Sequence, residues 1–275
     1  MRFFIVPSHR KLSVLALALL LPLYSLNAIA QAPTEPAQNT YIEGAVLWQQ
    51  SSGERRALSY QAFALARMML DRDLRMNRRL RKPRAVIVDL DETILDNSPY
   101  EGALLKRRVN YPDGWTEWVN RAEAAAVPGA LEFLNYAASR GVRVFYVTNR
   151  IPIEKEGTAR NLKKLGFPKV DDQSLLTSPG PRSASKEPRR NGISAKYHVV
   201  LLMGDDLNDF AKVFEDSKTV DSRIAASDRF KDEFGKRFIV LPNAMYGNWE
   251  QAIYEYNKLS EAEKAALRKK QLHAN

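Results

Sequence analysis

Short runs of aliphatic and β-branched residues, separated by stretches with helical spacing, fill the chain after Pro83. Runs of this length without polar alternation are typical of parallel strands that are buried on both faces of a sheet. We expect such strands at residues 85–90, 142–148, 175–177, 199–203 and 238–241. The alternation of strand and helix therefore predicts an α/β fold in which helices cover both faces of a parallel sheet.

The predicted helices between these runs have recognisable ends. One helix is expected from Pro128 to about Arg140, where Gly141 stops it, and another from Pro152 to Gly166. Proline fits the first turn of a helix, and glycine fits the position just past its end. Both helices lie between predicted strands, as the crossover helices of a parallel sheet do.

Two further helices are expected outside the strand region. Ser59 is a candidate N-cap for a long helix that runs to about Arg81. Ser260 and Glu263 match a capping box that opens a final charged helix to about Leu272.

Basic residues crowd the last turns of the long helix before Pro83: Arg75, Arg78, Arg79, Arg81 and Lys82. They indicate either a surface that attracts anions or membranes, or a solvated helix end that the helix dipole favours. The sequence leaves both interpretations open.

The first thirty residues have the pattern of an export signal. Arg2, Arg10 and Lys11 precede an uncharged run over residues 12–26, and small residues follow up to Ala30. The run is shorter than the ~20 apolar residues that a membrane span needs, although a retained anchor is the alternative. We expect residues 1–30 to be a cleaved signal peptide. The remaining residues 31–275 are expected to form a single domain, with a core at about 84–243 and helical additions at about 41–82, 98–127 and 246–273.

Composition narrows the chemistry that this chain can perform. There is no Cys, which excludes a disulfide framework, a thiolate zinc site, a cysteine nucleophile and a lipid on an N-terminal Cys. Of the three His, His9 lies in the predicted signal, so histidine-phosphate and multi-histidine metal mechanisms are disfavoured. Without residues 1–30 the chain holds 39 basic and 32 acidic residues, and this net charge of +7 suits a cell envelope or a polyanionic ligand.

Polar residues follow three of the predicted strands, at the edge where open parallel sheets bind ligands. Asp89 and Asp91 follow the first strand, Thr148 and Asn149 the second, and a run that begins at Asp205 the third. Residues two apart on an extended chain point the same way, so Asp89 and Asp91 can face a common point. A single D-x-D run is also typical of a helix start, but three polar strand ends in order favour a site.

Carboxylates gathered without His or Cys select Mg²⁺ rather than zinc, and Mg²⁺ in turn implies a phosphoryl ligand. Asp89 is then a candidate nucleophile toward phosphorus, and Asp91 a candidate acid and base for the leaving alcohol and the attacking water. Thr148 and Asn149 can donate hydrogen bonds to phosphoryl oxygens. Lys186 is the best candidate for the balancing positive charge, on its spacing to the third strand.

The runs DLDET, VTNR and GDDLND, with Lys186 between the last two, resemble in their order the four motifs of the haloacid dehalogenase superfamily. Longer strings, such as AVIVDLDETILDNSPY and RFIVLPNAMYGNWE, are similar to the class C non-specific acid phosphatases of bacterial envelopes, the outer-membrane lipoprotein nucleotidase group. The resemblance covers about residues 60–254. It implies a Rossmann-like parallel sheet with helices on both faces and a smaller helical subdomain.

The resemblance also implies roles for individual residues. Asp89 would be the nucleophile, Asp91 the acid and base, and Thr148, Asn149 and Lys186 the phosphoryl clamp. The implied ligands of Mg²⁺ are the Asp89 carboxylate, the Asp91 backbone carbonyl and Asp205, with Asp209 a second ligand or a support for Lys186. The family dephosphorylates nucleoside monophosphates and other phosphomonoesters at acid pH.

This sequence departs from the family in two places. Many members carry a lipid on an N-terminal Cys, which is absent here, so we expect a periplasmic or secreted enzyme without a stable membrane anchor. Around residues 178–190 the sequence PGPRSASKEPRR stands where relatives tend to have a Lys-rich run, and the Lys186 assignment therefore rests on its spacing to Asp205.

Aromatic residues flank the proposed site. Tyr246 and Trp115 are candidates to sandwich a nucleobase, since every base has a stacking face. The alternative is that they pack the smaller helical layer, as we expect for Trp118, Tyr111 and Tyr100. Arg150 can reach the phosphate or pair with an acidic neighbour, and the sequence does not choose.

The leading hypothesis is an exported, magnesium-dependent acid phosphatase that acts through an aspartyl-phosphate. Its partners would be small phosphomonoesters, with nucleotides among them, and not a nucleic-acid polymer. One alternative is a non-catalytic envelope protein that binds haem or a polyanion on a phosphatase fold. Another is a phosphotransferase, in which an alcohol replaces water. The oligomeric state is left open.

Overall fold

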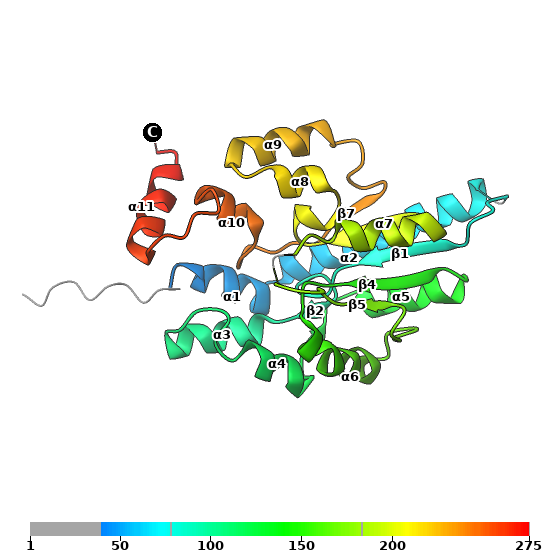
Figure 1. The fold of residues 1–275 in the computed structure, drawn as a ribbon, viewed down its shortest axis with the longest axis horizontal. Helices are drawn as coiled ribbons and strands as arrows, with labels where there is room; N and C mark the ends of the chain where they lie inside the picture. Colours follow the sequence, from blue (N-terminus) through cyan, green and yellow to red (C-terminus); the bar gives the residue numbers. More distant parts are fainter. Residues whose placement is uncertain (1–39, 78, 183, 275) are drawn as a thin grey trace, which may run out of the picture. The chain divides into compact units, whose positions relative to one another are not determined.

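The computed structural model describes residues 40–274, apart from 78 and 183. Within them, a sheet of five parallel strands has the order β5-β4-β1-β6-β7 (Figure 1). These strands are β1 Arg84–Val88, β4 Arg143–Val147, β5 Leu175–Leu176, β6 His198–Gly204 and β7 Phe238–Val240. The predicted α/β fold is confirmed, and all the predicted strands are present with slightly different ends.

Helices precede, connect and follow the strands. Before β1 lie the short 3₁₀ helix η1 Thr40–Ile42, α1 Glu43–Ser51 and α2 Gly53–Met76. Between β1 and β4 lie α3 Ser98–Arg107, α4 Trp115–Arg121 and α5 Ala130–Ser139. Between β4 and β7 lie η2 Pro152–Glu154, α6 Lys155–Leu165, α7 Glu187–Lys196, η3 Leu207–Asp209, α8 Lys212–Asp216 and α9 Val220–Arg229. After β7 lie α10 Asn248–Ile253 and α11 Glu261–Gln271.

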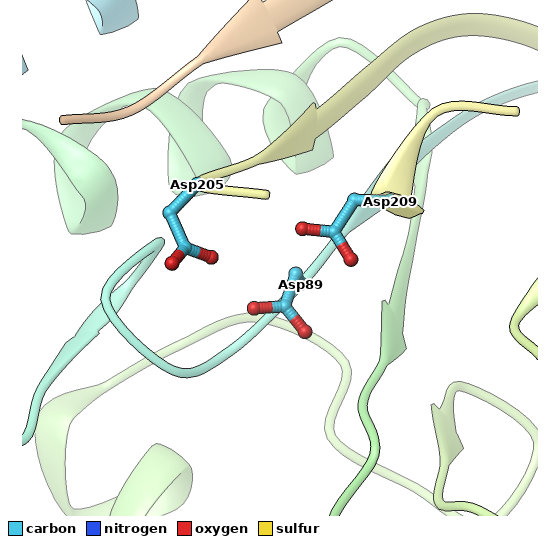
Figure 2. A group of neighbouring side chains, drawn as sticks. All are labelled: Asp89, Asp205 and Asp209. Atoms are coloured by element: carbon cyan, nitrogen blue, oxygen red, sulfur yellow. The ribbon is translucent and has the colours of Figure 1, made fainter. Parts of the chain in front are cut away.

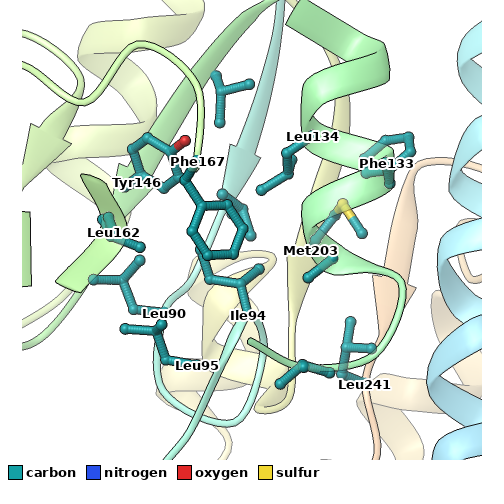
Figure 3. Close-up of a cluster of buried hydrophobic side chains, with 14 of the residues drawn as sticks. Leu90, Ile94, Leu95, Phe133, Leu134, Tyr146, Leu162, Phe167, Met203 and Leu241 are labelled. Atoms are coloured by element: carbon teal, nitrogen blue, oxygen red, sulfur yellow. The ribbon is translucent and has the colours of Figure 1, made fainter. Parts of the chain in front are cut away.

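Each face of the sheet has its own hydrophobic cluster, because alternate strand side chains point to opposite faces. Val86 and Val88 of β1 join the larger cluster with residues of α2 and α5, part of which Figure 3 shows. Ala85 and Ile87 join a second cluster with residues of α7, α8 and α9. Helices therefore cover both faces, as the uninterrupted apolar strands predict.

The long helix before β1 begins earlier than predicted. Its N-cap is Ser52, whose hydroxyl accepts a hydrogen bond from the Arg55 N–H at 3.0 Å. The predicted cap, Ser59, is buried inside α2 and donates to the carbonyl oxygen of Arg55 at 3.0 Å. Serine bonds the backbone in either position, so the residue type alone could not choose between them. The helix also ends at Met76 rather than near Arg81.

Other predicted helix ends are confirmed. α5 begins soon after Pro128, and Gly141 follows its end with φ +74°. α6 is closed by Gly166 at φ +85°, a left-handed conformation that glycine adopts without strain. Ser260 and Glu263 form the capping box of α11, with the Ser260 N–H donating to Glu263 Oε2 at 2.8 Å.

A smaller addition interrupts the chain after β1. It contains α3, α4 and an antiparallel pair of short strands, β2 Leu95–Asp96 and β3 Ala125–Ala126. The segment matches the helical subdomain expected at 98–127 and lies next to the carboxyl edge of the sheet, since β1 leads directly into it.

The predicted signal peptide at residues 1–30 lies outside the described residues. The described residues lie in one compact unit that contains every described helix and strand. No helix within residues 40–274, with 78 and 183 set aside, is long and apolar enough to span a membrane.

Candidate active site

Three carboxylates meet at the carboxyl edge of the sheet (Figure 2). Asp89 directly follows β1, Asp205 follows β6, and Asp209 is the last residue of η3. One carboxylate oxygen of each lies within 4.8 Å of one oxygen of the other two. Since β1 and β6 are hydrogen-bonded neighbours, their ends meet without any further loop. The fold thus brings together three of the four residues predicted to hold the metal.

The absence of a side chain at Gly204 lets Asp209 approach the end of β6. A Cβ at Gly204 would lie 2.4 Å from the Asp209 Cβ and 2.3 Å from its Oδ2. Real Cβ atoms do not come this close to other heavy atoms, so the glycine of the GDD run is required by space.

Lys186 lies inside the carboxylate cluster. Its Nζ donates to Asp89 Oδ1 and to Asp209 Oδ1, the latter at 2.6 Å, and the residue is 8% exposed. Burial alone would lower its pKa, but the carboxylates of Asp209 and Asp89 outweigh burial and hold the pKa above its ordinary value. Lys186 is therefore a permanent cation beside Asp89, at the position that its spacing to Asp205 predicts.

Burial and mutual repulsion raise the pKa values of the carboxylates in this cluster. Burial, followed by repulsion from Asp209 and Asp91, raises the pKa of Asp89 to about 7, although Lys186 acts against this rise. Burial and neighbouring carboxylates also raise the pKa of Asp205 and of Asp209. A divalent cation would relieve the repulsion and keep all three groups ionised.

The donor set fits a divalent cation. Asp89, Asp205 and Asp209 offer carboxylate oxygens from three separate positions of one edge, and hard cations prefer such oxygen ligands. The carboxylate of Asp91 does not join this group, because it is turned toward Arg150. A metal contact from the Asp91 backbone carbonyl stays a prediction.

Arg150 pairs with an acidic neighbour, which decides between the two roles left open by the sequence. Its Nη2 donates to Asp91 Oδ1 at 2.7 Å, and its Nε donates to the same oxygen at 3.1 Å. The guanidinium also donates to Thr158 Oγ1 at 3.0 Å. The Arg150 side chain is 1% exposed, whereas that of Asp91 is 21% exposed. A buried cation thus fixes a carboxylate that is still open to solvent.

Asn97 and Glu92 complete the support of Asp91. The Asn97 Nδ2 donates to Asp91 Oδ1 at 2.9 Å, and the Asn97 N–H donates to Glu92 Oε1 at 2.7 Å. Trp118 Nε1 donates to Asn97 Oδ1 at 2.8 Å, which fixes the amide orientation. Because Glu92 is buried next to Asp91 and Asp205, its pKa is well above its ordinary value.

Thr148 and Asn149 directly follow β4, at the same carboxyl edge of the sheet. The Arg150 N–H donates to Thr148 Oγ1 at 3.1 Å. Arg189, at the start of α7, donates to the Thr148 carbonyl oxygen at 2.5 Å and to Asn149 Oδ1 at 3.0 Å. Arg189 therefore holds two of the three predicted phosphate-binding residues, and the third, Lys186, is the N-cap residue of the same helix.

Two further side chains contact the clustered carboxylates. The Thr93 hydroxyl lies 3.2 Å from Asp205 Oδ1 and 3.3 Å from Asp89 Oδ2. Asn243, just after β7, donates from Nδ2 to Asp205 Oδ2 at 2.8 Å. Groups of this kind tune the ligands of a metal site.

The two predicted base-stacking residues have different surroundings. Tyr246 donates from its hydroxyl to Glu92 Oε2. Trp115 is 6% exposed and packs edge-on against Tyr100, with ring centroids 5.0 Å apart. The Arg150 guanidinium lies 5.5 Å from the centre of the Trp115 ring. Both aromatic residues therefore flank the Asp91 support, and stacking on a base stays a prediction for each.

Sequence reasoning missed several functional candidates: Glu92, Thr93, Asn97, Arg189 and Asn243. Thr93 and Glu92 lie inside the quoted DLDET run, and Asn243 follows a predicted strand, so position could have pointed to them. Asn97 and Arg189 reach the site through contacts that no local pattern encodes.

The chain is similar to known acid phosphatases in both sequence and structure. A model of the acid phosphatases of haloacid dehalogenase superfamily subfamily IIIB matches residues 18–249. The structure is similar to that of the class C acid phosphatase from Bacillus anthracis, with a TM-score of 0.83 and 38% identity. The match covers 87% of this chain and 100% of that chain, with the same values for the form with tungstate bound.

Curated plant proteins are more distant relatives. A stem 31 kDa glycoprotein of Glycine max is 26% identical over 193 residues, which cover 68% of this chain and 71% of that protein. A stem 28 kDa glycoprotein of the same plant is 26% identical over 181 residues, which cover 63% of this chain and 65% of that protein.

Proposed function

The chain belongs to the acid phosphatases of haloacid dehalogenase superfamily subfamily IIIB and is a phosphomonoesterase, and we propose that it is an exported, magnesium-dependent enzyme that forms an aspartyl-phosphate on Asp89. Its proposed substrates include nucleoside 5′-monophosphates. The observation that carries the proposal is the contact of Asp89 with Lys186 inside a cluster of three carboxylates. This arrangement combines a nucleophile, a fixed cation and a metal-binding donor set at one strand end.

The proposed reaction has two displacements at phosphorus. In the first, an oxygen of Asp89 forms a bond to phosphorus while the bond from phosphorus to the ester oxygen breaks. Asp91 gives its proton to that departing oxygen, so the product leaves as a neutral alcohol. In the second, Asp91 takes a proton from water, the water oxygen bonds to phosphorus, and the bond to Asp89 breaks. Free phosphate leaves and both carboxylates return to their starting states.

The chain's cations and donors would hold the phosphoryl group during both steps. Lys186 is a fixed positive charge beside the attacking oxygen of Asp89. Thr148 and Asn149 would donate to the remaining phosphoryl oxygens, and the bonds from Arg189 support their positions. Donors that are already oriented stabilise developing charge without reorganisation.

Asp89, Asp205 and Asp209 would hold Mg²⁺, with Asn243 and Thr93 orienting two of the ligands. The bound ion supplies Lewis-acid stabilisation of the phosphoryl oxygens. Magnesium is favoured over zinc because the donor set consists of carboxylates.

The preference for nucleotides rests on the aromatic residues around Asp91. Tyr246 is half-buried next to Glu92 and keeps part of its side chain open near Asp91, whereas Trp115 is 6% exposed and would have to uncover its ring before a base could stack on it. A base that stacks on either of them would keep its sugar 5′-oxygen near Asp91. The bacterial neighbour has been crystallised with tungstate, a tetrahedral oxyanion like phosphate.

Export is proposed from the sequence alone. The charged start, apolar run and small residues up to Ala30 favour a cleaved signal peptide and a periplasmic or secreted location.

One assay set tests the proposal. Phosphate release from p-nitrophenyl phosphate, adenosine 5′-monophosphate and glycerol 3-phosphate is measured with Mg²⁺ and with EDTA. We expect turnover of each substrate with Mg²⁺, loss with EDTA, and loss in Asp89→Asn. Turnover that survives EDTA would refute the metal requirement, and no preference for the nucleotide over glycerol 3-phosphate would refute base recognition. Added glycerol that diverts most product into phosphoglycerol would identify a phosphotransferase instead.

A further inference from the structure

A cleft of about 680 Å³ lies at the edge of the sheet that is opposite the carboxylate cluster. Its lining includes His198, the first residue of β6, and residues from the last turns of α2 and from the turn before β7. Asp205 follows the last residue of the same strand β6. The cleft and the active site therefore lie at opposite ends of one strand, and the cleft plays no part in the proposed reaction.

The cleft is strongly basic. Arg72, Lys82, Lys236 and Arg237 line it, and all four residues are exposed. The acidic residue of its lining, Asp73, already accepts hydrogen bonds from Arg84 at 2.6 Å and His198 at 2.9 Å. Lys236 has only an exposed contact with Asp232 at 3.6 Å, which contributes little. Lys82 Nζ donates to the neutral carbonyl oxygen of Ser194 at 3.0 Å, which leaves its charge uncompensated, so the cleft keeps an excess of positive charge that can bind an anion.

Further basic residues lie in the last turn of α2 and in the chain that follows it. Arg75, Arg79 and Arg81 are all exposed and lie within a few residues of Arg72 and Lys82. In Figure 1 this end of α2 projects at the right, whereas α11 lies at the left of the picture. We call the cleft residues Arg72, Lys82, Lys236 and Arg237, together with Arg75, Arg79 and Arg81, the basic edge.

Apolar side chains lie within this basic edge. Met76 lines the cleft and is 70% exposed, and Met68, two turns earlier on α2, is 61% exposed. Exposed apolar side chains flanked by Lys and Arg are typical of surfaces that rest in the headgroup region of an anionic membrane. A nucleic-acid site would instead favour aromatic rings that are free to stack. The aromatic residue of the cleft, Tyr197, packs edge-on against Phe145, with ring centroids 4.9 Å apart.

We propose that the basic edge docks the protein on anionic phospholipid headgroups, with phosphate groups in the cleft and Met76 in the interface. This assigns the basic helix end to membrane attraction rather than to simple solvation. The active-site edge then faces away from the lipid, where soluble phosphomonoesters have free access.

Vesicle sedimentation tests the proposal. The chain from Gln31 onward is suitable, because the described residues lie in one compact unit that contains all described helices and strands. We expect it to bind vesicles of phosphatidylglycerol at about 0.1 M salt, to be released by high salt, and not to bind phosphatidylcholine. Lys236→Glu/Arg237→Glu should weaken binding by at least about 25-fold, since each basic residue contributes roughly fivefold.

Matched variants separate this surface from net charge. Lys269→Glu/Lys270→Glu reverses two exposed neighbouring charges on α11, and we expect it to bind vesicles like the parent. The neutral variant Lys236→Gln/Arg237→Gln should lose about 25-fold in binding, and charge reversal should cost more than neutralisation. All variants should keep the parent rate on p-nitrophenyl phosphate, which reports folding. Equal loss in the α11 variant, unchanged binding in both Lys236/Arg237 variants, or binding to duplex DNA but not to phosphatidylglycerol would overturn the proposal.

Discussion

The buried Arg150 guanidinium donates two hydrogen bonds to the Asp91 carboxylate. Its Nη2 lies 2.7 Å and its Nε lies 3.1 Å from the same atom, Asp91 Oδ1. A planar guanidinium fixes both the position and the orientation of a carboxylate. Asp91 is thereby kept out of the cluster of Asp89, Asp205 and Asp209, although it lies only two residues from Asp89. In the proposed mechanism, the pair separates Asp89, which would attack phosphorus, from Asp91, which would transfer protons.

Arg150→Lys is expected to impair proton transfer selectively. Lysine keeps the positive charge but cannot donate from two fixed nitrogen atoms, so the Asp91 carboxylate should be poorly oriented toward the leaving oxygen. We predict a fall of about 100-fold in kcat/KM for glycerol 3-phosphate. The fall for p-nitrophenyl phosphate should be under about tenfold, because p-nitrophenolate leaves without a proton. An equal fall for both esters would contradict this role and indicate a general structural defect.

Gly204→Ala should disrupt the site by steric contact. The new methyl group would lie within 2.4 Å of the Asp209 Cβ, so Asp209 and its bond to Lys186 must move. We expect a loss of stability of about 1–3 kcal/mol, together with most of the activity. Thermal unfolding and p-nitrophenyl phosphate assays measure both. Gly192→Ala is the control, because a Cβ at Gly192 in α7 meets nothing within 4 Å.

Asn243→Ala should weaken metal binding while leaving catalysis at saturating metal nearly intact. Asn243 orients Asp205 at 2.8 Å and is not expected to contact the substrate. The Mg²⁺ concentration for half-maximal activity should rise by about 10- to 100-fold. Asn135→Ala on the exposed side of α5 should not change it. A lower kcat at saturating Mg²⁺ with no shift in the midpoint would contradict this role.

Glu101 should make stability depend on pH. Burial raises its pKa to about 7 from the ordinary 4.5, so the folded state holds a proton that the unfolded state has released. The free energy of unfolding should therefore fall as the pH rises from about 4.5 to about 7, by roughly 3 kcal/mol from this group. Glu101→Gln should remove that part of the fall, with a clear gain in the urea midpoint at about pH 8 and little change at about pH 4. Glu117→Gln, at an exposed position, should change neither, and a Glu101→Gln gain that is equal at both pH values would contradict the account.

The strands and their polar ends could be predicted because each depends on local sequence. A strand that is buried on both faces must be apolar throughout, and the polar residues Asp89, Thr148 and Asp205 begin where the sheet ends. Parallel topology then brings these strand ends to one edge of the sheet, independently of the conformations of the connecting loops.

Contacts between distant segments could not be predicted in the same way. The pairing of Arg150 with Asp91 and the support of Asn149 by Arg189 depend on side-chain conformations that only the folded chain defines. The start of α2 was misplaced for a similar reason, since Ser52 and Ser59 are chemically alike and differ only in the tertiary contacts around them.

Trapping of the covalent intermediate tests the central claim most directly. The enzyme is mixed with p-nitrophenyl phosphate and Mg²⁺, quenched in acid within the first turnover, digested, and searched by mass spectrometry for a phosphorylated peptide. We predict phosphate on Asp89, formed and lost at rates consistent with turnover, and none in Asp89→Asn. Phosphate on another residue, or an Asp89→Asn enzyme that turns over at the normal rate, would contradict the account.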